Sequence, residues 1–211
     1  MAKVQLPRPD RSVETFTLSA PRVDFRLSGR PFTRIALSAG HVVADPLADV
    51  DPWLSAAVDW DKTIAFREYV WSLGLGMAEA MDTAQRGMGL DWGQALELIR
   101  RSVAASKAHK GAVVFSGAGT DHLPVENAKS LDDVIRAYEE QFEAIEALGG
   151  RIIFMASRAL AKIAKSPDDY GIVYDRILRQ AKEPVIIHWL GDMFDPALSG
   201  YWGDRDADAA M

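Results

Sequence analysis

Residues 111–122, GAVVFSGAGTDH, decide the fold that we expect for this chain. Their short apolar run at 112–116 passes directly into glycine and then into polar side chains, which is typical of a buried strand entering a loop. Four further runs have the same form: RIALSAGH at 34–41, GLGMAEAMD at 74–82, RIIFMASR at 151–158 and PVIIHWLGD at 184–192. The chain therefore repeats one structural unit five times.

The segments between these runs have the pattern of amphipathic helices. Helix starts are predicted at Asp59, at Asp91 with Gln94 three residues on, at Ser130 with Asp133, and at Ser166 before Pro167. The runs begin roughly 40 residues apart, the spacing of strand–helix repeats. Alternating strands and helices predict an α/β protein with a parallel sheet.

Two folds fit five such repeats. The first is the N-terminal portion of a (β/α)8 TIM barrel, with about five parallel strands and a β-hairpin before them. The second is a complete doubly wound domain of flavodoxin-like size. The long loop at 41–59 and the hairpin-like start favour the barrel. Because five strands only half close a barrel, the barrel interpretation requires further strands from a longer chain or from a partner.

The first thirty residues differ from the rest of the chain. Segments 13–18 and 23–27 alternate apolar and polar residues and are separated by Ser-Ala-Pro-Arg, which predicts a hairpin. We expect an arm and hairpin at 1–33, five βα units at 34–203 and a flexible acidic tail at 204–211.

Composition limits the class of protein. The 211 residues are 48% hydrophobic with a net charge of −6, which suits one sizeable core and argues against a nucleic-acid binder. Seven Lys and Arg against three acids in residues 1–35 are interpreted as a solvated arm. The absence of cysteine excludes disulfides and thiolate catalysis. Without a signal peptide or a membrane-length apolar run, the protein is expected to be cytoplasmic and free of membranes.

Polar side chains gather where the predicted strands end. The carboxyl ends of parallel strands meet at one edge, where the chemistry of α/β enzymes is found. Three of the four histidines, His41, His122 and His188, follow such strands. Arg86 and Arg158 have the fork geometry that holds a substrate carboxylate. Plainer roles stay open for single residues, such as a core position for His188 and a turn-supporting role for Asp121.

Four stretches of the chain resemble a known family: SAGHVVADP at 38–46, GMAEAMDTAQRGMGLDW at 76–92, SGAGTDHL at 116–123 and IIHWLGDMFDP at 186–196. They are similar to the dihydrodipicolinate synthase and N-acetylneuraminate lyase group of aldolases, and most of all to dihydrodipicolinate-synthase-like proteins of actinobacterial type. The resemblance covers nearly the whole chain. It implies a (β/α)8 barrel, often tetrameric, in which a strand-6 lysine forms a Schiff base with pyruvate or a related 2-oxo acid.

The resemblance also assigns expected roles to single residues. Thr83 is the one residue kept from the group's carboxylate-binding Thr-Thr motif, and Gly117 and Gly119 match its Gly-x-Gly turn. His188 takes the place of its proton-relay tyrosine and is the expected catalytic acid/base. The expected substrate-binding residues are Thr83, Arg158, Gly117, Gly119 and Asp121. The strand-6 lysine has no counterpart in this chain, since Lys162, Lys165 and Lys182 lie in helical or loop segments.

Three functional hypotheses follow. The first is an aldolase or lyase acting on a 2-oxo acid or a carbohydrate-derived substrate, without a cofactor and with the Schiff-base lysine outside this chain. The second is a lyase or isomerase whose divalent metal is held by His41, Glu79, His122 and His188. The third is a non-catalytic assembly module. A small-molecule substrate and either a homo-oligomer or the remaining barrel segment are the expected partners.

Overall fold

The computed structural model describes residues 3–20 and 33–210 and contains two compact units, Met1–Pro31 and Phe32–Met211. In the first unit, β1 (Lys3–Pro7) and β2 (Val13–Thr17) form an antiparallel hairpin with Val4 opposite Phe16. The predicted strand at 13–18 is therefore present, but its partner precedes it in the chain. The predicted partner at 23–27 lies outside the described residues.

The second unit is built on a parallel sheet of five strands. They are β3 (Leu37–Ala39), β4 (Gly76–Glu79), β5 (Val114–Ala118), β6 (Arg151–Phe154) and β7 (Ile186–Ile187). The strands lie in chain order, β3-β4-β5-β6-β7. A doubly wound sheet reverses its order at a switch point, whereas a TIM barrel does not. The fold is thus a curled half-barrel, as expected, and the doubly wound alternative is excluded.

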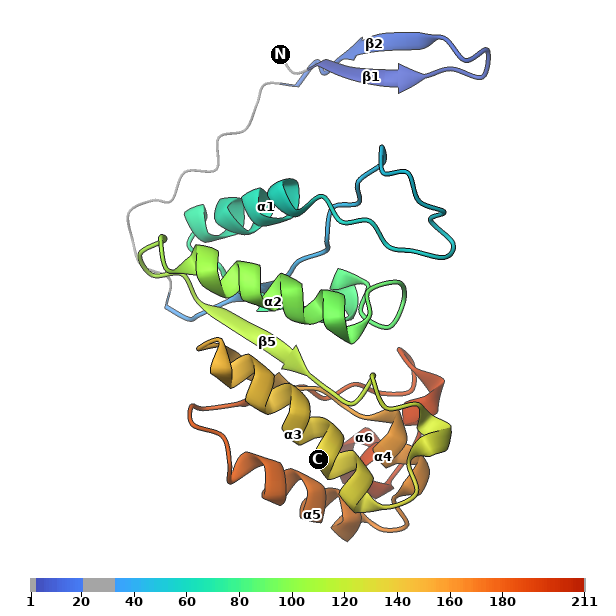
Figure 1. Cartoon of the computed structure of the whole chain (residues 1–211), viewed down its shortest axis with the longest axis vertical. Helices are drawn as coiled ribbons and strands as arrows, with labels where there is room; N and C mark the ends of the chain where they lie inside the picture. The colour runs from blue at the N-terminus through green and yellow to red at the C-terminus, as the bar shows by residue number, and fades with distance from the viewer. Residues whose placement is uncertain (1–2, 21–32, 211) are drawn as a thin grey trace. The chain divides into compact units, whose positions relative to one another are not determined.

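Helices follow the strands. The longer ones are α1 (Trp60–Ser72), α2 (Trp92–Ser106), α3 (Leu131–Ala147) and α5 (Pro167–Leu178). Figure 1 shows these four helices of the second unit in chain order, with α1 uppermost and α5 lowest. The short elements are η1 (Asp82–Ala84), η2 (Val125–Asn127), α4 (Arg158–Ile163), η3 (Pro196–Leu198), η4 (Tyr201–Gly203) and α6 (Ala207–Ala210).

Capping side chains fix where the helices begin. Asp91 accepts a hydrogen bond from the backbone of Gln94, and Ser130 and Asp133 form a reciprocal capping box. The carboxylate of Asp169 accepts from the backbone N–H of Ser166, directly before Pro167. These contacts satisfy N–H groups that the first helical turn leaves without partners, so the predicted starts are confirmed.

The sheet has two apolar faces of unequal size. The larger core lies between the sheet and the helices and includes Met77, Val114, Ile152 and Phe154. The opposite face is a small cluster of Leu37, Ala78, Met81, Phe115, Ile153 and Met155. Since side chains alternate along a strand, this second face corresponds to the interior of a barrel. The half-barrel therefore carries a partial lumen.

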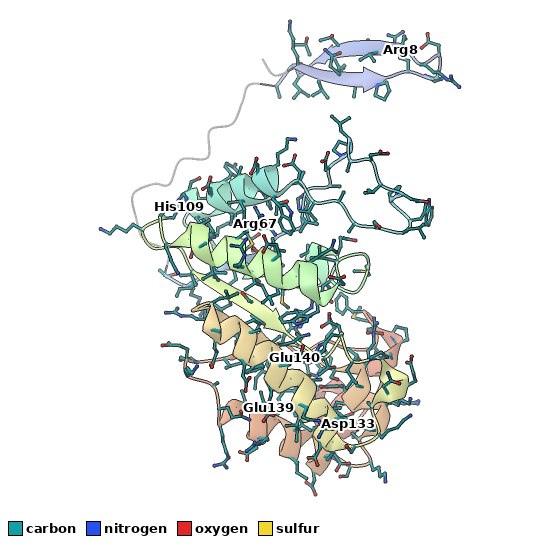
Figure 2. All side chains as sticks on the ribbon, viewed as in Figure 1. Arg8, Arg67, His109, Asp133, Glu139 and Glu140 are labelled. Atoms are coloured by element: carbon teal, nitrogen blue, oxygen red, sulfur yellow. The ribbon has the colours of Figure 1, made fainter. Side chains whose placement is uncertain are left out.

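A buried ion pair fastens α1 to the end of β4. Arg67 and Glu79 are both fully buried, and Arg67 Nη2 donates to Glu79 Oε1 at 2.8 Å. Arg67 Nη1 donates to the carbonyl of His41 at 2.6 Å, and the hydroxyl of Ser102 on α2 donates to Glu79 Oε2. Figure 2 shows the position of Arg67. One charge pair thus joins two helices, β4 and the loop after β3.

Breaking this pair should destabilise the protein strongly. We expect Arg67→Met to lower the free energy of unfolding by about 3–5 kcal/mol, because Glu79 is left charged and buried without its partner. The double variant Arg67→Met with Glu79→Leu should regain most of the loss, since no buried charge remains. Urea unfolding measures both.

Arg179→Ala is the matched control, because Arg179 forms an exposed pair with Asp175 on α5. Exposed pairs contribute little to stability. If Arg67→Met cost no more than this control, the fastening role of the buried pair would be wrong.

Candidate functional site

The turn after β4 has a strained backbone. Ala80 is fully buried and adopts a left-handed conformation with φ of 53°, which is costly for a residue with a side chain. Its N–H donates to Glu79 Oε1 at 3.0 Å, and its carbonyl accepts from Arg86 Nη1 at 3.3 Å. Hydrogen bonds from both sides therefore hold this turn at the carboxyl edge of the sheet.

Arg86 is the centre of the polar cluster at this edge. Its side chain is 2% exposed, and it forms an ion pair with Asp121, with Nη2 2.7 Å from Oδ1 and Nε 3.2 Å from Oδ2. Nη1 also donates to the carbonyl of Gly117, and Nη2 donates to Gln141 Oε1. The guanidinium lies 5.2 Å from the ring of Trp92. Arg86 thereby links the ends of β4 and β5 to α2 and α3.

Asp121 is held in its charged form. Burial alone would raise the pKa of this carboxyl, but the hydrogen bonds and charge of Arg86 and a hydrogen bond from Gln141 lower it below its usual value. The side chain of Asp121 remains 29% exposed. It is therefore a fixed carboxylate that still reaches solvent.

Gln141 and His122 continue the cluster. Gln141 is fully buried on α3, and its Nε2 lies 3.1 Å from Asp121 Oδ1 and 2.7 Å from His122 Nδ1. The other ring nitrogen of His122 lies 3.2 Å from Oε2 of Glu140, also on α3. A continuous polar chain thus runs from Arg86 to Glu140.

An open pocket of about 480 Å³ lies beside this chain. Its lining is Gly87, Gly89, Leu90, Asp91, Trp92, Gly93, Asp121 and His122. A glycine-rich loop, an indole, a carboxylate and an imidazole therefore surround one cavity near the strand ends. Such a mixture of apolar wall and few polar groups is common in small-molecule sites.

A cluster of hydroxyl groups lies at the end of β6. The hydroxyls of Thr120 and Ser157 are 2.6 Å apart, and those of Tyr174 and Tyr201 are 3.2 Å apart. Tyr201 also accepts from the backbone N–H of Ser157, and Tyr138 donates to the carbonyl of Met155. Burial raises the pKa of all three tyrosines, which keeps them neutral. This cluster therefore supplies structure rather than charge.

The predicted substrate-binding residues lie in different local environments. Gly117 and Gly119 are buried at the edge beside Arg86 and Asp121. Thr83 is exposed on η1, and Arg158 is 61% exposed and paired with Asp195 at 2.5 Å. Arg86, expected to bind a substrate carboxylate, instead uses its guanidinium to hold Asp121 and backbone carbonyls. Substrate binding by Thr83, Arg158, Gly117, Gly119 and Asp121 stays a prediction.

The four residues predicted to bind a metal are not gathered at one point. Glu79 pairs with Arg67, His41 packs on Phe66 at 5.0 Å between rings, and His122 lies between Gln141 and Glu140. In the described part of the chain, no three His, Cys, Asp or Glu side chains form a group suited to a metal ion. The sequence pattern placed these residues near one edge but did not reveal their separate partners.

His188 retains a free ring nitrogen. Its backbone N–H donates to the carbonyl of Phe154 at 2.9 Å, which continues the pairing of β7 with β6. Ile186, two residues earlier, pairs with Ile153 on the lumen face, so alternation directs His188 to the same face. Its Nδ1 is buried without a hydrogen-bond partner among the described residues. A buried nitrogen without a hydrogen-bond partner is expected at a position where a ligand supplies the partner.

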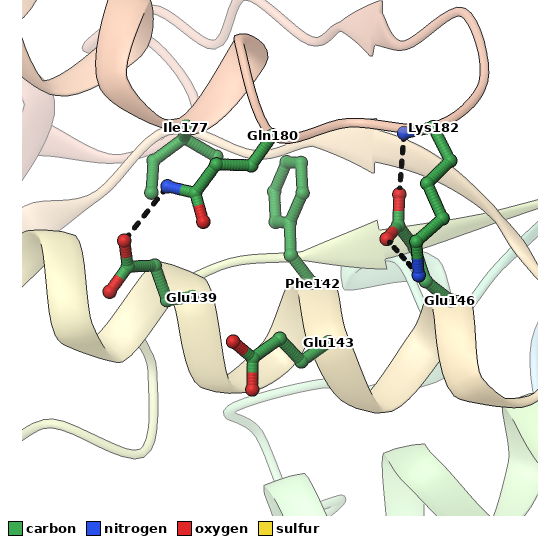
Figure 3. Close-up of a pocket in the computed structure, with 7 residues that line it drawn as sticks. All are labelled: Glu139, Phe142, Glu143, Glu146, Ile177, Gln180 and Lys182. Atoms are coloured by element: carbon green, nitrogen blue, oxygen red, sulfur yellow. Dashed lines mark hydrogen bonds and ion pairs between the residues drawn. The ribbon is translucent and has the colours of Figure 1, made fainter.

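A second hollow, of about 190 Å³, lies between α3 and α5. Figure 3 shows that its polar groups mostly satisfy one another: Gln180 donates to Glu139, and Lys182 bonds to Glu146. It is lined by helical residues and the segment after α5, not by the strand ends. We assign no function to it.

In the residues that the structure describes, no helix combines the length and the apolar character needed to cross a bilayer.

The fold and the strand-end cluster together define a (β/α)-barrel-type protein that contains the first five strand–helix units. The chain belongs to the family described as "Protein of unknown function (DUF993)", whose model matches residues 4–211. No curated protein matches the chain. The narrower expectation, a dihydrodipicolinate-synthase-like family, is thus supported only at the level of the fold.

Two solved structures resemble the half-barrel. Dihydrodipicolinate synthase from Bacillus clausii is 16% identical with a TM-score of 0.51, over 78% of this chain and 48% of that one. The same enzyme from Oceanobacillus iheyensis is 15% identical with a TM-score of 0.50, over 79% and 49%. The chain therefore spans about half the length of these structures. At such identities the likeness shows the fold alone.

The Arg86–Asp121 pair should make stability depend on pH. Because the folded-state pKa of Asp121 is lowered, its contribution is present above its ordinary value of 3.8 and is lost as pH falls through the folded-state value. We expect Asp121→Asn to cost about 2 kcal/mol at pH 7, with the cost shrinking towards pH 3.

Urea unfolding at both pH values measures this difference. Asp175→Asn is the control, because Asp175 forms only an exposed pair with Arg179. A cost for Asp121→Asn that stays constant between pH 7 and pH 3 would contradict the lowering of the Asp121 pKa in the folded state.

Proposed function

We propose that the whole protein is an aldolase- or lyase-type enzyme that makes or breaks a carbon–carbon bond in a 2-oxo acid or a carbohydrate-derived substrate. The observation that carries this proposal is the polar cluster around Arg86 and Asp121. It occupies the carboxyl edge of a half-barrel whose structural neighbours are dihydrodipicolinate synthases. That edge is where barrel enzymes bind substrate.

A Schiff-base mechanism fits the open lumen. The nucleophilic lysine is proposed to come from polypeptide outside these 211 residues, since no described lysine lies in or directly after a strand of the parallel sheet. Amine catalysis of this kind requires no metal. The edge strands β3 and β7 each have one neighbour among the described strands, which leaves room for the segment that would bring the lysine.

His188 is the proposed acid/base group. It follows β7 on the lumen face, and the unpartnered Nδ1 gives it a nitrogen able to accept or return a proton. Acid/base catalysis is also the role that the resemblance to the aldolase group implies for this position.

Borohydride trapping tests the proposal. The whole protein incubated with pyruvate and then reduced should gain the mass of one covalently bound substrate on a lysine, located by peptide mass spectrometry. Protein reduced without pyruvate is the control. If a panel of 2-oxo acids gave no adduct on any lysine, the Schiff-base proposal would be wrong.

The variant His188→Phe separates binding from catalysis. We expect the adduct to form but turnover to fall by roughly 10²–10⁴-fold, the usual contribution of general acid–base catalysis. His109→Phe is the matched control, since His109 pairs with Glu68 on the side of α1 and α2. Equal turnover in both variants would remove His188 from the mechanism.

A further inference from the structure

The orientation of the Gln141 side chain is fixed by its neighbours. Its Oε1 faces two donors, the backbone N–H of Gly119 at 2.7 Å and Nη2 of Arg86. Its Nε2 faces the carboxylate of Asp121 at 3.1 Å. Turning the amide over would set an N–H group against two donors and an oxygen against a carboxylate. Only one orientation therefore satisfies every partner.

This orientation decides which nitrogen of His122 carries the proton. Gln141 Nε2 lies 2.7 Å from His122 Nδ1 and is a donor, so Nδ1 must be the acceptor. A neutral imidazole with a free Nδ1 has its proton on Nε2. That nitrogen lies 3.2 Å from Glu140 Oε2, an acceptor. If Nδ1 of His122 were protonated as well, its N–H would face the N–H of Gln141 Nε2, and the two donors would repel each other.

We infer that His122 is a neutral hydrogen-bond donor for a substrate carbonyl oxygen in the pocket beside Trp92. Arg86 and Gly119 orient Gln141, Gln141 fixes the tautomer of His122, and His122 is one of the residues that line the cavity. The acceptor that it uses in the structure, Glu140, has a side chain that is 61% exposed and free to yield its place to a ligand.

This donor suits the chemistry of a carbonyl compound. A neutral imidazole polarises a carbonyl oxygen by hydrogen bonding and keeps its proton throughout, so no charge has to move through the cluster. The inferred ligand is therefore the carbonyl part of the substrate, and this catalytic use, unlike the tautomer, rests on the proposed function.

Nuclear magnetic resonance of the ¹⁵N-histidine-labelled whole protein tests the tautomer without any ligand. We expect His122 to show a protonated Nε2 and an unprotonated Nδ1 at pH 7. In Gln141→Glu an ionised carboxylate at 141 can only accept, so the proton should move to Nδ1. Glu140→Gln, which keeps an acceptor for Nε2–H, should leave the tautomer unchanged.

His109 is the internal reference, since its ring also lies near a carboxylate, 3.3 Å from Glu68, but has no contact with Gln141. Its signals should be the same in every variant. If the Gln141→Glu variant does not fold, the wild-type spectrum alone decides. A wild-type His122 that carries its proton on Nδ1, or on both nitrogens, would overturn the inference.

Activity tests the catalytic use. His122→Phe removes the donor and should lower kcat about 100-fold, as loss of one donor to a developing oxyanion does. His122→Gln restores an N–H group and should recover part of the rate. Unchanged turnover in His122→Phe would refute the donor role. Borohydride trapping in the same variants separates the two proposals. If the adduct forms and the tautomer is as expected, but His122→Phe does not slow turnover, only the donor role of His122 is wrong. If the wild-type protein forms no adduct, the proposed function is wrong.

Discussion

A buried guanidinium dictates how the strand ends of this half-barrel are arranged. Arg86 is 2% exposed, so its N–H groups must find acceptors inside the protein or incur a large desolvation cost. It finds them on the carbonyls of Ala80 and Gly117 and on the side chains of Asp121 and Gln141. Satisfying one cation thus fixes the relative positions of two strand ends and a helix.

The strained turn at Ala80 lies between two buried cations. On one side, Arg67 holds Glu79, and Glu79 accepts the N–H of Ala80. On the other side, Arg86 bonds the carbonyl of Ala80. A left-handed alanine is retained because its surroundings determine it completely. The stability of the helix layer and the shape of the candidate site are therefore coupled through a single residue.

Sequence reasoning succeeded where the cause is local. The helix starts at Asp91, Ser130 and Ser166 depend on side chains within three residues. The spacing of the apolar runs is sufficient to predict parallel strands, but it left their order open between a barrel and a doubly wound sheet, and the structure has them in chain order. The site was only partly predictable. The sequence alone did not show which face of the sheet the side chain of Glu79 takes. Its partner Arg67 is twelve residues away on a helix, so no local pattern revealed the pair. Gln141, which orients His122, belongs to a helix pattern with nothing to set it apart from a surface glutamine.

The space around Gly117 constrains how this protein can change. A side chain there would come within 2.7 Å of the Met155 sulfur and 3.0 Å of both the Met81 sulfur and the carbonyl of Ala80. The two thioethers can shift or be shortened, but the carbonyl cannot, because it belongs to the strained turn. A smaller residue at 155 or 81 would relieve only part of this crowding, so position 117 is restricted to glycine as long as Ala80 keeps its left-handed conformation.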